Sequence, residues 1–168
     1  AIFHLFTHAF FKAVLFLSSG SVMHAMHDVI DMREFSGLRK VLPVTHIAFL
    51  CGALALAGIP LFSGFWSKDM VLEAALEAGH SDRFGTIYMI LFGVALTTAL
   101  MTAFYTFRAY FRTFWGPLRM PDGAHPHETW VMNLPLIVLA IGAIFVGIAV
   151  EPFNHLFSGF LSKAPFLA

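Results

Sequence analysis

Residues 44–78 have the sequence VTHIAFLCGALALAGIPLFSGFWSKDMVLEAALEA, and this stretch decides the fold. As one helix it would be ~53 Å long at 1.5 Å per residue, against a hydrocarbon core of ~30 Å. Pro60 removes a backbone donor near its middle, and Gly58 and Gly64 loosen the chain on either side. The residues leave two structures open: a complete span at 44–65 followed by an interfacial helix, or a discontinuous helix with an unwound midpoint.

The second half of the stretch, SKDMVLEAAL, indicates a helix that restarts after a break near 58–65. Ser67 is placed to cap its N-terminus, and Asp69 falls in its first turn, where a negative charge is favourable. The expected location of Lys68 differs between the two structures. In a discontinuous helix it lies inside the membrane, whereas in an interfacial helix it contacts lipid headgroups.

The rest of the chain is also typical of a membrane protein. Its 168 residues are 58% hydrophobic and only 12% charged, about half the usual charged share of ~25%. Asp, Glu, Lys and Arg are absent from residues 41–67, 84–107 and 129–150, and residues 1–27 contain only Lys12. We therefore predict an all-α, polytopic transmembrane helix bundle with one discontinuous helix. It forms a single membrane domain over residues 1–168, with spans at about 2–26, 44–78 (broken near 58–65), 84–112 and 131–150.

The composition excludes several classes of function. The formal net charge is zero, which gives no basic surface for nucleic acid. The single cysteine, Cys51, supports neither a disulfide framework nor a metal site, and the sequence has no glycine-rich phosphate loop or cysteine cluster. We expect no redox centre, metal or cofactor in this chain. Because the chain begins inside an apolar run, we also expect it to be a fragment of a longer protein.

Basic residues predict the orientation of the spans. Six of them lie in or beside the first and third connections: Arg33, Arg39, Lys40, Arg108, Arg112 and Arg119. The second connection has only Arg83, plus Lys68 if that residue lies outside the membrane. Since cytoplasmic loops carry the excess of Lys and Arg, we expect the first and third connections in the cytoplasm.

A polar stripe runs along the first predicted span. His4, His8 and Lys12 are four residues apart and fall at roughly 0°, 40° and 80° around the helix, on one face of an otherwise apolar segment. A lysine near the bilayer centre costs roughly 2.5–3.5 kcal/mol, so it faces the bundle interior or water. The stripe is favoured as a proton or ion path, and a satisfied structural stripe is the main alternative. A metal held by the two histidines, or a haem held with His46, stays open as a weaker one.

Three stretches are specific enough to indicate a family. The first two are HLFTHAFFKAVLFLSSGSVMHAMHDVIDMREFSGLRKVLPVT, residues 4–45, and GALALAGIPLFSGFWSKD, residues 52–69. They resemble the antiporter-like membrane subunits of respiratory complex I, the NADH:quinone oxidoreductase, and most of all their L (chain 5) type. The likeness continues through HPHETWVMNLPLIVLAIGAIFVGI, residues 125–148. It would place the chain in the second half of such a subunit.

The resemblance implies roles for individual residues. His4, His8 and Lys12 match the histidines and lysine of the central polar axis, Lys68 matches the key lysine of the broken helix, and Asp69 matches its acidic neighbour. It therefore favours the discontinuous form of residues 44–78. The chain departs from the family pattern at two positions, Leu61 and Met70. Family members commonly have a second proline where this chain has Leu61, and often an acidic residue where it has Met70.

The function implied by the resemblance is proton translocation coupled to quinone reduction elsewhere in the complex. The expected location is an energy-coupling membrane such as the bacterial inner membrane. The expected partners are other membrane subunits, the lipid bilayer, protons and water, with no nucleic acid. Two alternatives remain: the large subunit of a multisubunit Na+/H+ antiporter, and a structural membrane scaffold.

Overall fold

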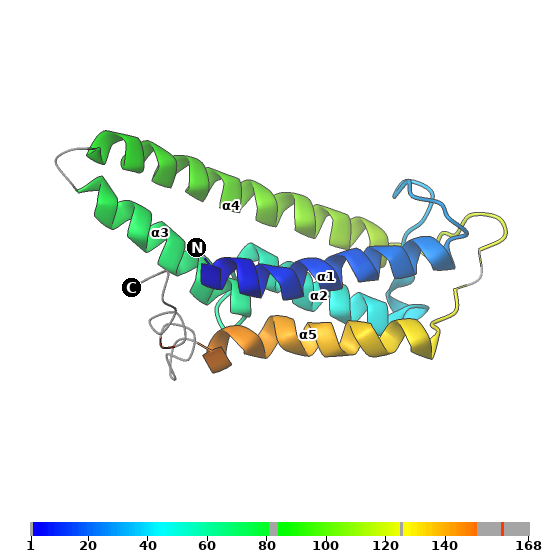
Figure 1. Ribbon diagram of the computed structural model, residues 1–168. Coiled ribbons are helices and arrows are strands. Elements are labelled where there is room, and N and C mark those ends of the chain that lie inside the picture. The colour runs from blue at the N-terminus through cyan, green and yellow to red at the C-terminus, as the bar shows by residue number, and fades with distance from the viewer. Residues whose placement is uncertain (1, 81–83, 125, 151–158, 160–168) are drawn as a thin grey trace.

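The structure, a computed structural model, describes residues 2–80, 84–124, 126–150 and 159 (Figure 1). Within these residues the fold is all-α, as predicted, and an isolated bridge between two connections is the only strand-like pairing. The helices are α1 (Ile2–Ala25), α2 (Pro43–Ala57), α3 (Ser63–Gly79), α4 (Gly85–Phe114) and α5 (Trp130–Val150), with a short 3-10 helix, η1 (Leu38–Lys40).

Three of the described helices are long and apolar enough to cross a membrane: Ile2–Ala25, Gly85–Phe114 and Trp130–Gly147. The shorter α2 is also apolar, but its 15 residues reach only ~22 Å, less than a hydrocarbon core of ~30 Å. Together these helices confirm the prediction of an all-α membrane bundle. The protein is an integral membrane protein.

The 44–78 stretch is a discontinuous helix, and this prediction is confirmed. Gly58 ends α2 in the left-handed region, at φ 78°. The amide of Gly58 donates to the carbonyl of Ala55 (3.1 Å) and that of Ile59 to Leu54 (3.1 Å), the bond pattern of a Schellman cap. Helical structure resumes at Ser63. The unwound segment is therefore residues 58–62, shorter than the sequence suggested.

Two predictions about the restart were wrong. Phe62, in extended geometry, is the N-cap of α3, and Ser67 lies a full turn inside the helix. Asp69 consequently falls in the second turn, and no acidic residue occupies the first. The reason is that Pro60 disturbs only the residues around it, so nothing prevents helical geometry from Ser63 onward.

Leu61 shows why the departure from the family pattern matters. Its φ is 81°, in the left-handed region that a leucine rarely adopts. A proline cannot reach this conformation, because its ring fixes φ near −65°. The unwound segment of this chain therefore has a local backbone path that a second proline at this position would forbid.

The first turn of α3 packs directly on the end of α2. A Cβ atom built on Gly64 would lie 1.8 Å from the carbonyl oxygen of Ala55, so only glycine fits there. Similar close approaches join α1 to α2 at Gly52, which faces Val14, and α1 to α5 at Gly142, which faces Phe10. Small residues of this kind let membrane helices approach closely.

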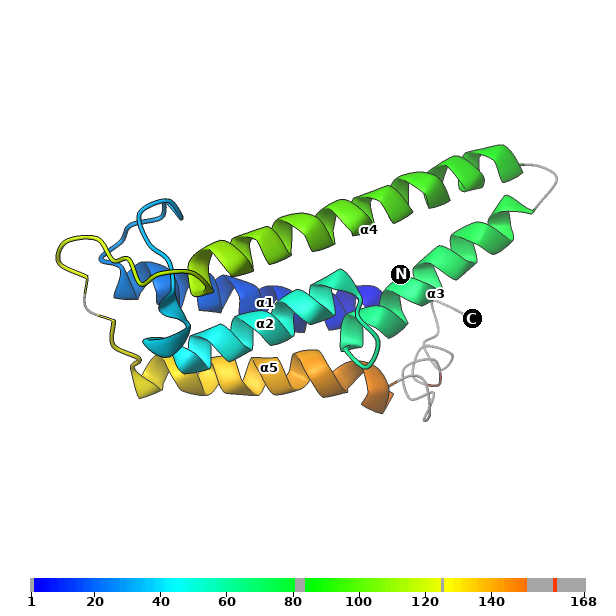
Figure 2. The same cartoon turned by 180° about the vertical axis from the view of Figure 1, so that it is seen from behind.

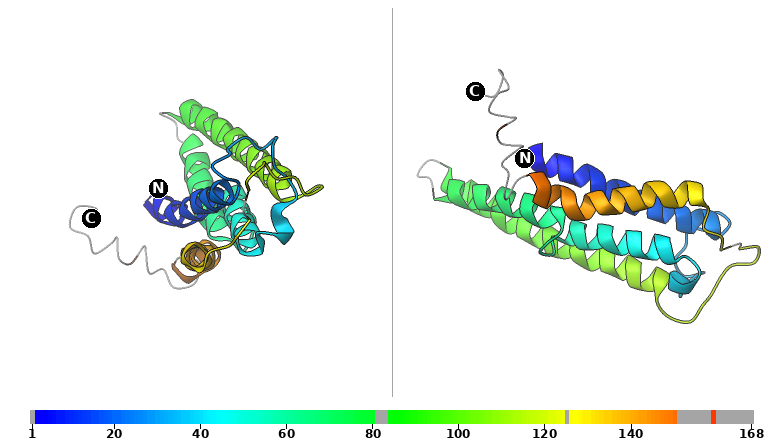
Figure 3. Two further views of the ribbon diagram at one scale, coloured as in Figure 1. Left: turned by 90° about the vertical axis from the view of Figure 1, so that its right-hand side faces the viewer. Right: turned by 90° about the horizontal axis from the view of Figure 1, so that it is seen from below.

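The helices α1, α2 and α5 run alongside one another, whereas α3 diverges from them and meets α4 at the far end (Figures 1 and 2). Seen end-on, α4 and α5 lie on opposite sides of the α1–α2 pair (Figure 3). The core lies between α1, α2, α5 and the C-terminal part of α4. Its largest fully buried apolar side chains are Phe11, Met26, Leu38, Leu42, Phe114 and Leu136.

The first and third connections lie at the same end of the bundle and are joined (Figure 1). Ser36 and Arg119 exchange two backbone hydrogen bonds, of 3.1 and 3.0 Å. The Arg39 guanidinium stacks 4.1 Å above the Trp115 ring. A carboxylate oxygen of Glu128 also accepts a 2.9 Å bond from the Thr45 amide, at the positive end of α2. The two basic connections thus form one surface.

Candidate functional site: a cavity between the polar face of α1 and the broken helix

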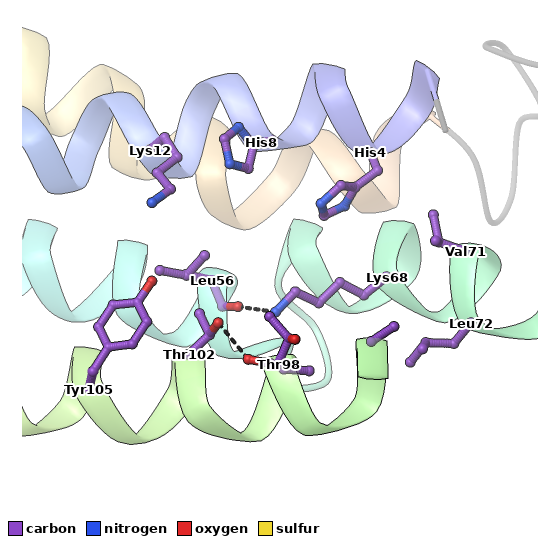
Figure 4. A pocket seen from close by; sticks show the side chains of 12 residues that line it. His4, His8, Lys12, Leu56, Lys68, Val71, Leu72, Thr98, Thr102 and Tyr105 are labelled. Atoms are coloured by element: carbon purple, nitrogen blue, oxygen red, sulfur yellow. Dashed lines mark hydrogen bonds between the residues drawn. The ribbon is translucent and has the colours of Figure 1, made fainter. Parts of the chain in front are cut away.

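A cavity of about 410 Å³ lies between α1, α3 and α4 (Figure 4). Its walls bring together four of the five residues that the sequence singled out: His4, His8 and Lys12 from α1, and Lys68 from α3. The remaining lining residues come from α2, α3 and α4: Leu56, Val71, Leu72, Ala95, Thr98, Ala99, Thr102 and Tyr105. The polar row of α1 therefore lines one side of the cavity, and Lys68 with the hydroxyl groups of α4 lines the other.

The three polar residues of α1 form a continuous row along the cavity (Figure 4). Their spacing of four residues puts them on one helix face, as predicted. The rings of His4 and His8 have centroids 5.9 Å apart, and Lys12 follows one turn further on. The Lys12 ammonium lies 5.9 Å from the centre of the Phe16 ring. All three side chains are half-buried, so each remains open to the cavity.

Lys68 links the two halves of the broken helix. Its ammonium donates a hydrogen bond to the carbonyl of Leu56, in the last turn of α2 (Figure 4). Carbonyl groups in the last turn of a helix have no partner within the helix, and they form the negative end of its dipole. The break therefore creates an acceptor for the lysine, and the lysine satisfies a backbone group that the break exposes.

Two buried hydroxyls form a site that the sequence reasoning missed. Ser67 Oγ lies 3.0 Å from His4 Nδ1, and Thr7 Oγ1 donates to Ser67 Oγ at 2.8 Å. Thr7 is fully buried, and Ser67 is 1% exposed. Thr7 stands out in the apolar helix α1, and this was the available signal, whereas Ser67 lies beside charged residues in α3. Their pairing required knowing how α1 and α3 face each other.

The α4 wall contributes hydroxyls rather than charges. Thr98 donates to the carbonyl of Val94 (2.8 Å) and Thr102 to that of Thr98 (2.7 Å), each within its own helix. Each oxygen still keeps lone pairs that can accept from water in the cavity. Tyr105 follows on the same side (Figure 4). A search for charged residues passes over this wall, because α4 has none in its membrane part.

A second cavity of about 150 Å³ continues from the first, and Lys12, Leu56 and Tyr105 line both. Its wall also includes Ser19 of α1 and Thr106 of α4. The cavities therefore extend from His4 past Lys12, toward the end of the bundle that carries the basic connections.

The metal and haem alternatives find no support in the geometry. Among the described residues, no three His, Cys, Asp or Glu side chains gather as a metal site would require. His46 is engaged with Tyr110: its Nε2 lies 2.7 Å from the tyrosine hydroxyl, and the two rings stack with centroids 5.5 Å apart.

Asp69 is the one predicted site residue that does not line the cavity. It is exposed on α3, one position beyond Lys68, and so projects from another side of the helix. Consecutive residues of a helix point ~100° apart, and here Lys68 lines the cavity whereas Asp69 is exposed outside it.

The family match and the similar proteins agree on one family. Residues 1–97 match the family described as NADH:quinone oxidoreductase/Mrp antiporter, TM. NADH-quinone oxidoreductase subunit L of Mycobacterium tuberculosis is 52% identical over 148 residues, which are 88% of this chain and 23% of that protein. Subunit L of Campylobacter jejuni is 45% identical over 166 residues, 96% of this chain and 25% of that protein.

NAD(P)H-quinone oxidoreductase chain 5 of Picosynechococcus sp. is 41% identical over 189 residues, with 95% of this chain and 27% of that protein covered. The chain thus spans about a quarter of the length of these relatives. The family match covers more than half of the chain, and the relatives match nearly all of it. The chain therefore belongs to the NADH:quinone oxidoreductase/Mrp antiporter transmembrane family.

Proposed function

We propose that this chain is part of a proton-translocating membrane subunit of NADH:quinone oxidoreductase, which couples quinone reduction elsewhere in the complex to proton transfer. The observation that carries the proposal is the cavity, because it gathers both interior lysines and two histidines around one space. The proposal is also supported by the printed names of the relatives, which are quinone oxidoreductase subunits.

The proton path runs along α1 and crosses to α3. His4, His8 and Lys12 exchange protons through water in the cavity, since neighbouring groups one helical turn apart are too far for direct transfer. Histidine suits this role because its charge changes near physiological pH, and lysine suits it when its surroundings allow a proton to leave. Asp69 belongs to the proposed path as the acidic neighbour of Lys68, on the side of α3 that faces away from the cavity.

Lys68 is the side chain that moves in the proposed mechanism. Its charged ammonium is held at the negative end of α2 by the carbonyl of Leu56. A neutral amine loses most of this attraction, and its flexible stem lets it turn toward the cavity. Gain and loss of a proton would thus switch Lys68 between the helix end and the space that it shares with His4.

The proposed setting is a single membrane domain in an energy-coupling membrane, such as the bacterial inner membrane. We place the joined connections, residues 26–42 and 115–129, on the cytoplasmic side, because six of the ten Lys and Arg residues lie in or beside them. The remaining partners are other membrane subunits, lipid, protons and water. The chain's own residues supply no redox chemistry in this proposal.

Replacing either interior lysine with arginine tests the proposal in the assembled oxidoreductase. Arginine keeps the positive charge but does not deprotonate in a protein, so Lys12→Arg and Lys68→Arg should both slow proton translocation by about tenfold or more. The measurement is proton pumping per electron transferred in reconstituted vesicles, normalised to the amount of assembled complex. Lys40→Arg is the matched control, because Lys40 is exposed on η1 and should leave pumping unchanged.

The alternatives predict different results. A structural scaffold needs only a fixed charge, so normal pumping by both arginine variants would refute the proton-cycling role. A Na+/H+ antiporter would show transport that depends on sodium, and repeating the assay in sodium-free medium separates that case.

A further inference from the structure

We propose that Ser67, supported by Thr7, is a positioning residue that holds the His4 ring by its Nδ1 atom and so makes Nε2 the nitrogen that exchanges protons with the cavity. The proposal rests on the proposed proton path, in which His4 takes part. It adds a cross-helix contact that the charge pattern of the sequence does not contain.

The geometry is that of a built contact rather than a surface encounter. Ser67 is 1% exposed and Thr7 is fully buried, so water does not compete for either hydroxyl. Ser67 Oγ has three polar neighbours: His4 Nδ1 at 3.0 Å, Thr7 Oγ1 at 2.8 Å and the Gly64 carbonyl at 3.4 Å. His4 itself is only half-buried and lines the cavity.

The protons of this group can be assigned so that each donor has an acceptor. Thr7 has one hydroxyl proton and donates it to Ser67 Oγ, the nearer of its two acceptors; the other is the His4 carbonyl at 3.2 Å. Ser67 donates its own proton to the Gly64 carbonyl. In the tautomer that we propose, the Ser67 oxygen accepts from the Nδ1–H of His4, and its two lone pairs suffice for both His4 and Thr7.

This assignment decides how His4 works. The hydrogen bond made by one imidazole nitrogen fixes the role of the other. With Nδ1–H held by Ser67, a proton from cavity water binds to Nε2 and later leaves from Nε2, while the Nδ1–H bond is kept throughout. The ring therefore changes charge without losing its position on the path.

The same contact joins the path to the broken helix. Ser67 lies in α3 immediately before Lys68, and its acceptor Gly64 is in the first turn of α3, against the end of α2. A change in the charge of His4 alters the strength of its bond to Ser67, since hydrogen bonds from a charged donor are stronger. His4 and Lys68 are thus coupled through the backbone that joins Ser67 to Lys68, as well as through the cavity.

The first test compares variants of the two hydroxyls in the assembled oxidoreductase. Ser67→Ala and Thr7→Val remove the hydroxyls, and Thr7→Val does so with little change in shape. We expect Ser67→Ala to slow proton pumping by about two- to tenfold, the effect of losing one hydrogen bond, and Thr7→Val to slow it less. Ser67→Thr and Thr7→Ser keep the hydroxyls and should restore most of the rate. Ser18→Ala is the control, because Ser18 is equally buried but bonds only to Val14 of its own helix.

The second test asks whether Ser67 acts through His4. In a His4→Ala background, Ser67→Ala should cause no further loss, so the double variant should pump at the rate of His4→Ala alone. Additive losses, or Ser67→Thr failing as badly as Ser67→Ala, would overturn the positioning role. If His4→Ala itself pumps normally while Lys68→Arg does not, His4 is not on the path and this inference fails, but the lysine path stands. If Lys68→Arg also pumps normally, the proposed function fails as well.

Discussion

Lys68 has two uses that depend on the same few atoms. As a cation it satisfies the Leu56 carbonyl at the end of α2, a group that the helix break leaves without a partner. As a lining residue of the cavity it faces the polar row of α1. A permanent charge would serve the first use alone. In the proposed mechanism the second use also requires a side chain that can lose its proton, which is why the arginine variants separate a structural role from proton transfer.

In the proposed path, His8 should be more important for proton pumping than His24, which lies in the last turn of α1. It lies between His4 and Lys12 in the row along the cavity, and its ring is 5.9 Å from that of His4. Replacing it with alanine leaves a gap of two helical turns, ~11 Å, in the row. We expect His8→Ala to lower the rate of proton pumping by about tenfold or more.

His24→Ala is the matched control for this prediction. His24 is exposed in the last turn of α1, near the basic connections, and does not line the main cavity. The measurement is again pumping per electron by the assembled complex. Equal losses in the two variants would show that the row has no special role.

At the scale of elements, the break between α2 and α3 positions the site. It turns a stretch too long for one span into two shorter helices, and it brings the end of α2 within reach of Lys68. The arrangement depends on Gly64, where α3 touches the backbone of α2. No comparable contact exists at Gly93 in α4, where the space for a Cβ atom is open.

This contrast predicts opposite outcomes for two Gly→Ala variants. Gly64→Ala places a methyl group 1.8 Å from the Ala55 carbonyl oxygen, so α2 and α3 must move apart, at a cost of about 1–3 kcal/mol. Gly93→Ala should be neutral or slightly stabilising, because alanine favours a helix. The check is the temperature at which the purified complex loses half of its pumping activity. A Gly64→Ala protein as heat-resistant as the Gly93→Ala protein would contradict the packing described here.

At the scale of the whole molecule, the two ends of the bundle differ. The connections that carry the basic residues are joined at one end, and the C-terminal end of α3 and the N-terminal end of α4 lie at the other (Figure 1). Arg83, which entered the prediction of orientation, lies outside the described residues. The pairing of Ser36 with Arg119 requires only that the two connections share a side. That this shared side is the cytoplasmic one is our proposal, and it rests on the basic residues in and beside the two connections.

Thiol labelling from the two sides of the membrane tests the orientation. Cys51 is the single cysteine of this chain and can be replaced by alanine. In a background without other reactive cysteines, Asp122→Cys, in the third connection, should react with an impermeant reagent only in inside-out vesicles. His80→Cys, at the end of α3, should react only in right-side-out vesicles. The reverse pattern would invert the proposed orientation.

The sequence by itself determined which segments are long and apolar enough to cross a membrane, and where the 44–78 stretch breaks. Both are local properties: apolar length sets the spans, and Pro60 with Gly58 interrupts the backbone hydrogen bonding wherever the helix lies. The row of His4, His8 and Lys12 was equally predictable, because a spacing of four residues places side chains on one face of any α-helix.

The tertiary structure decided what that face meets. The rotation of α1 against α3 set the contact between Thr7 and Ser67, and the same packing brought the hydroxyls of α4 to the cavity wall. It also showed Ser67 to be a contact inside α3 rather than its cap, and it turned Asp69 away from the cavity. The physical reason is that helical periodicity specifies a face, whereas the partner of that face depends on how the helices pack, which close contacts such as that at Gly64 fix across the whole bundle.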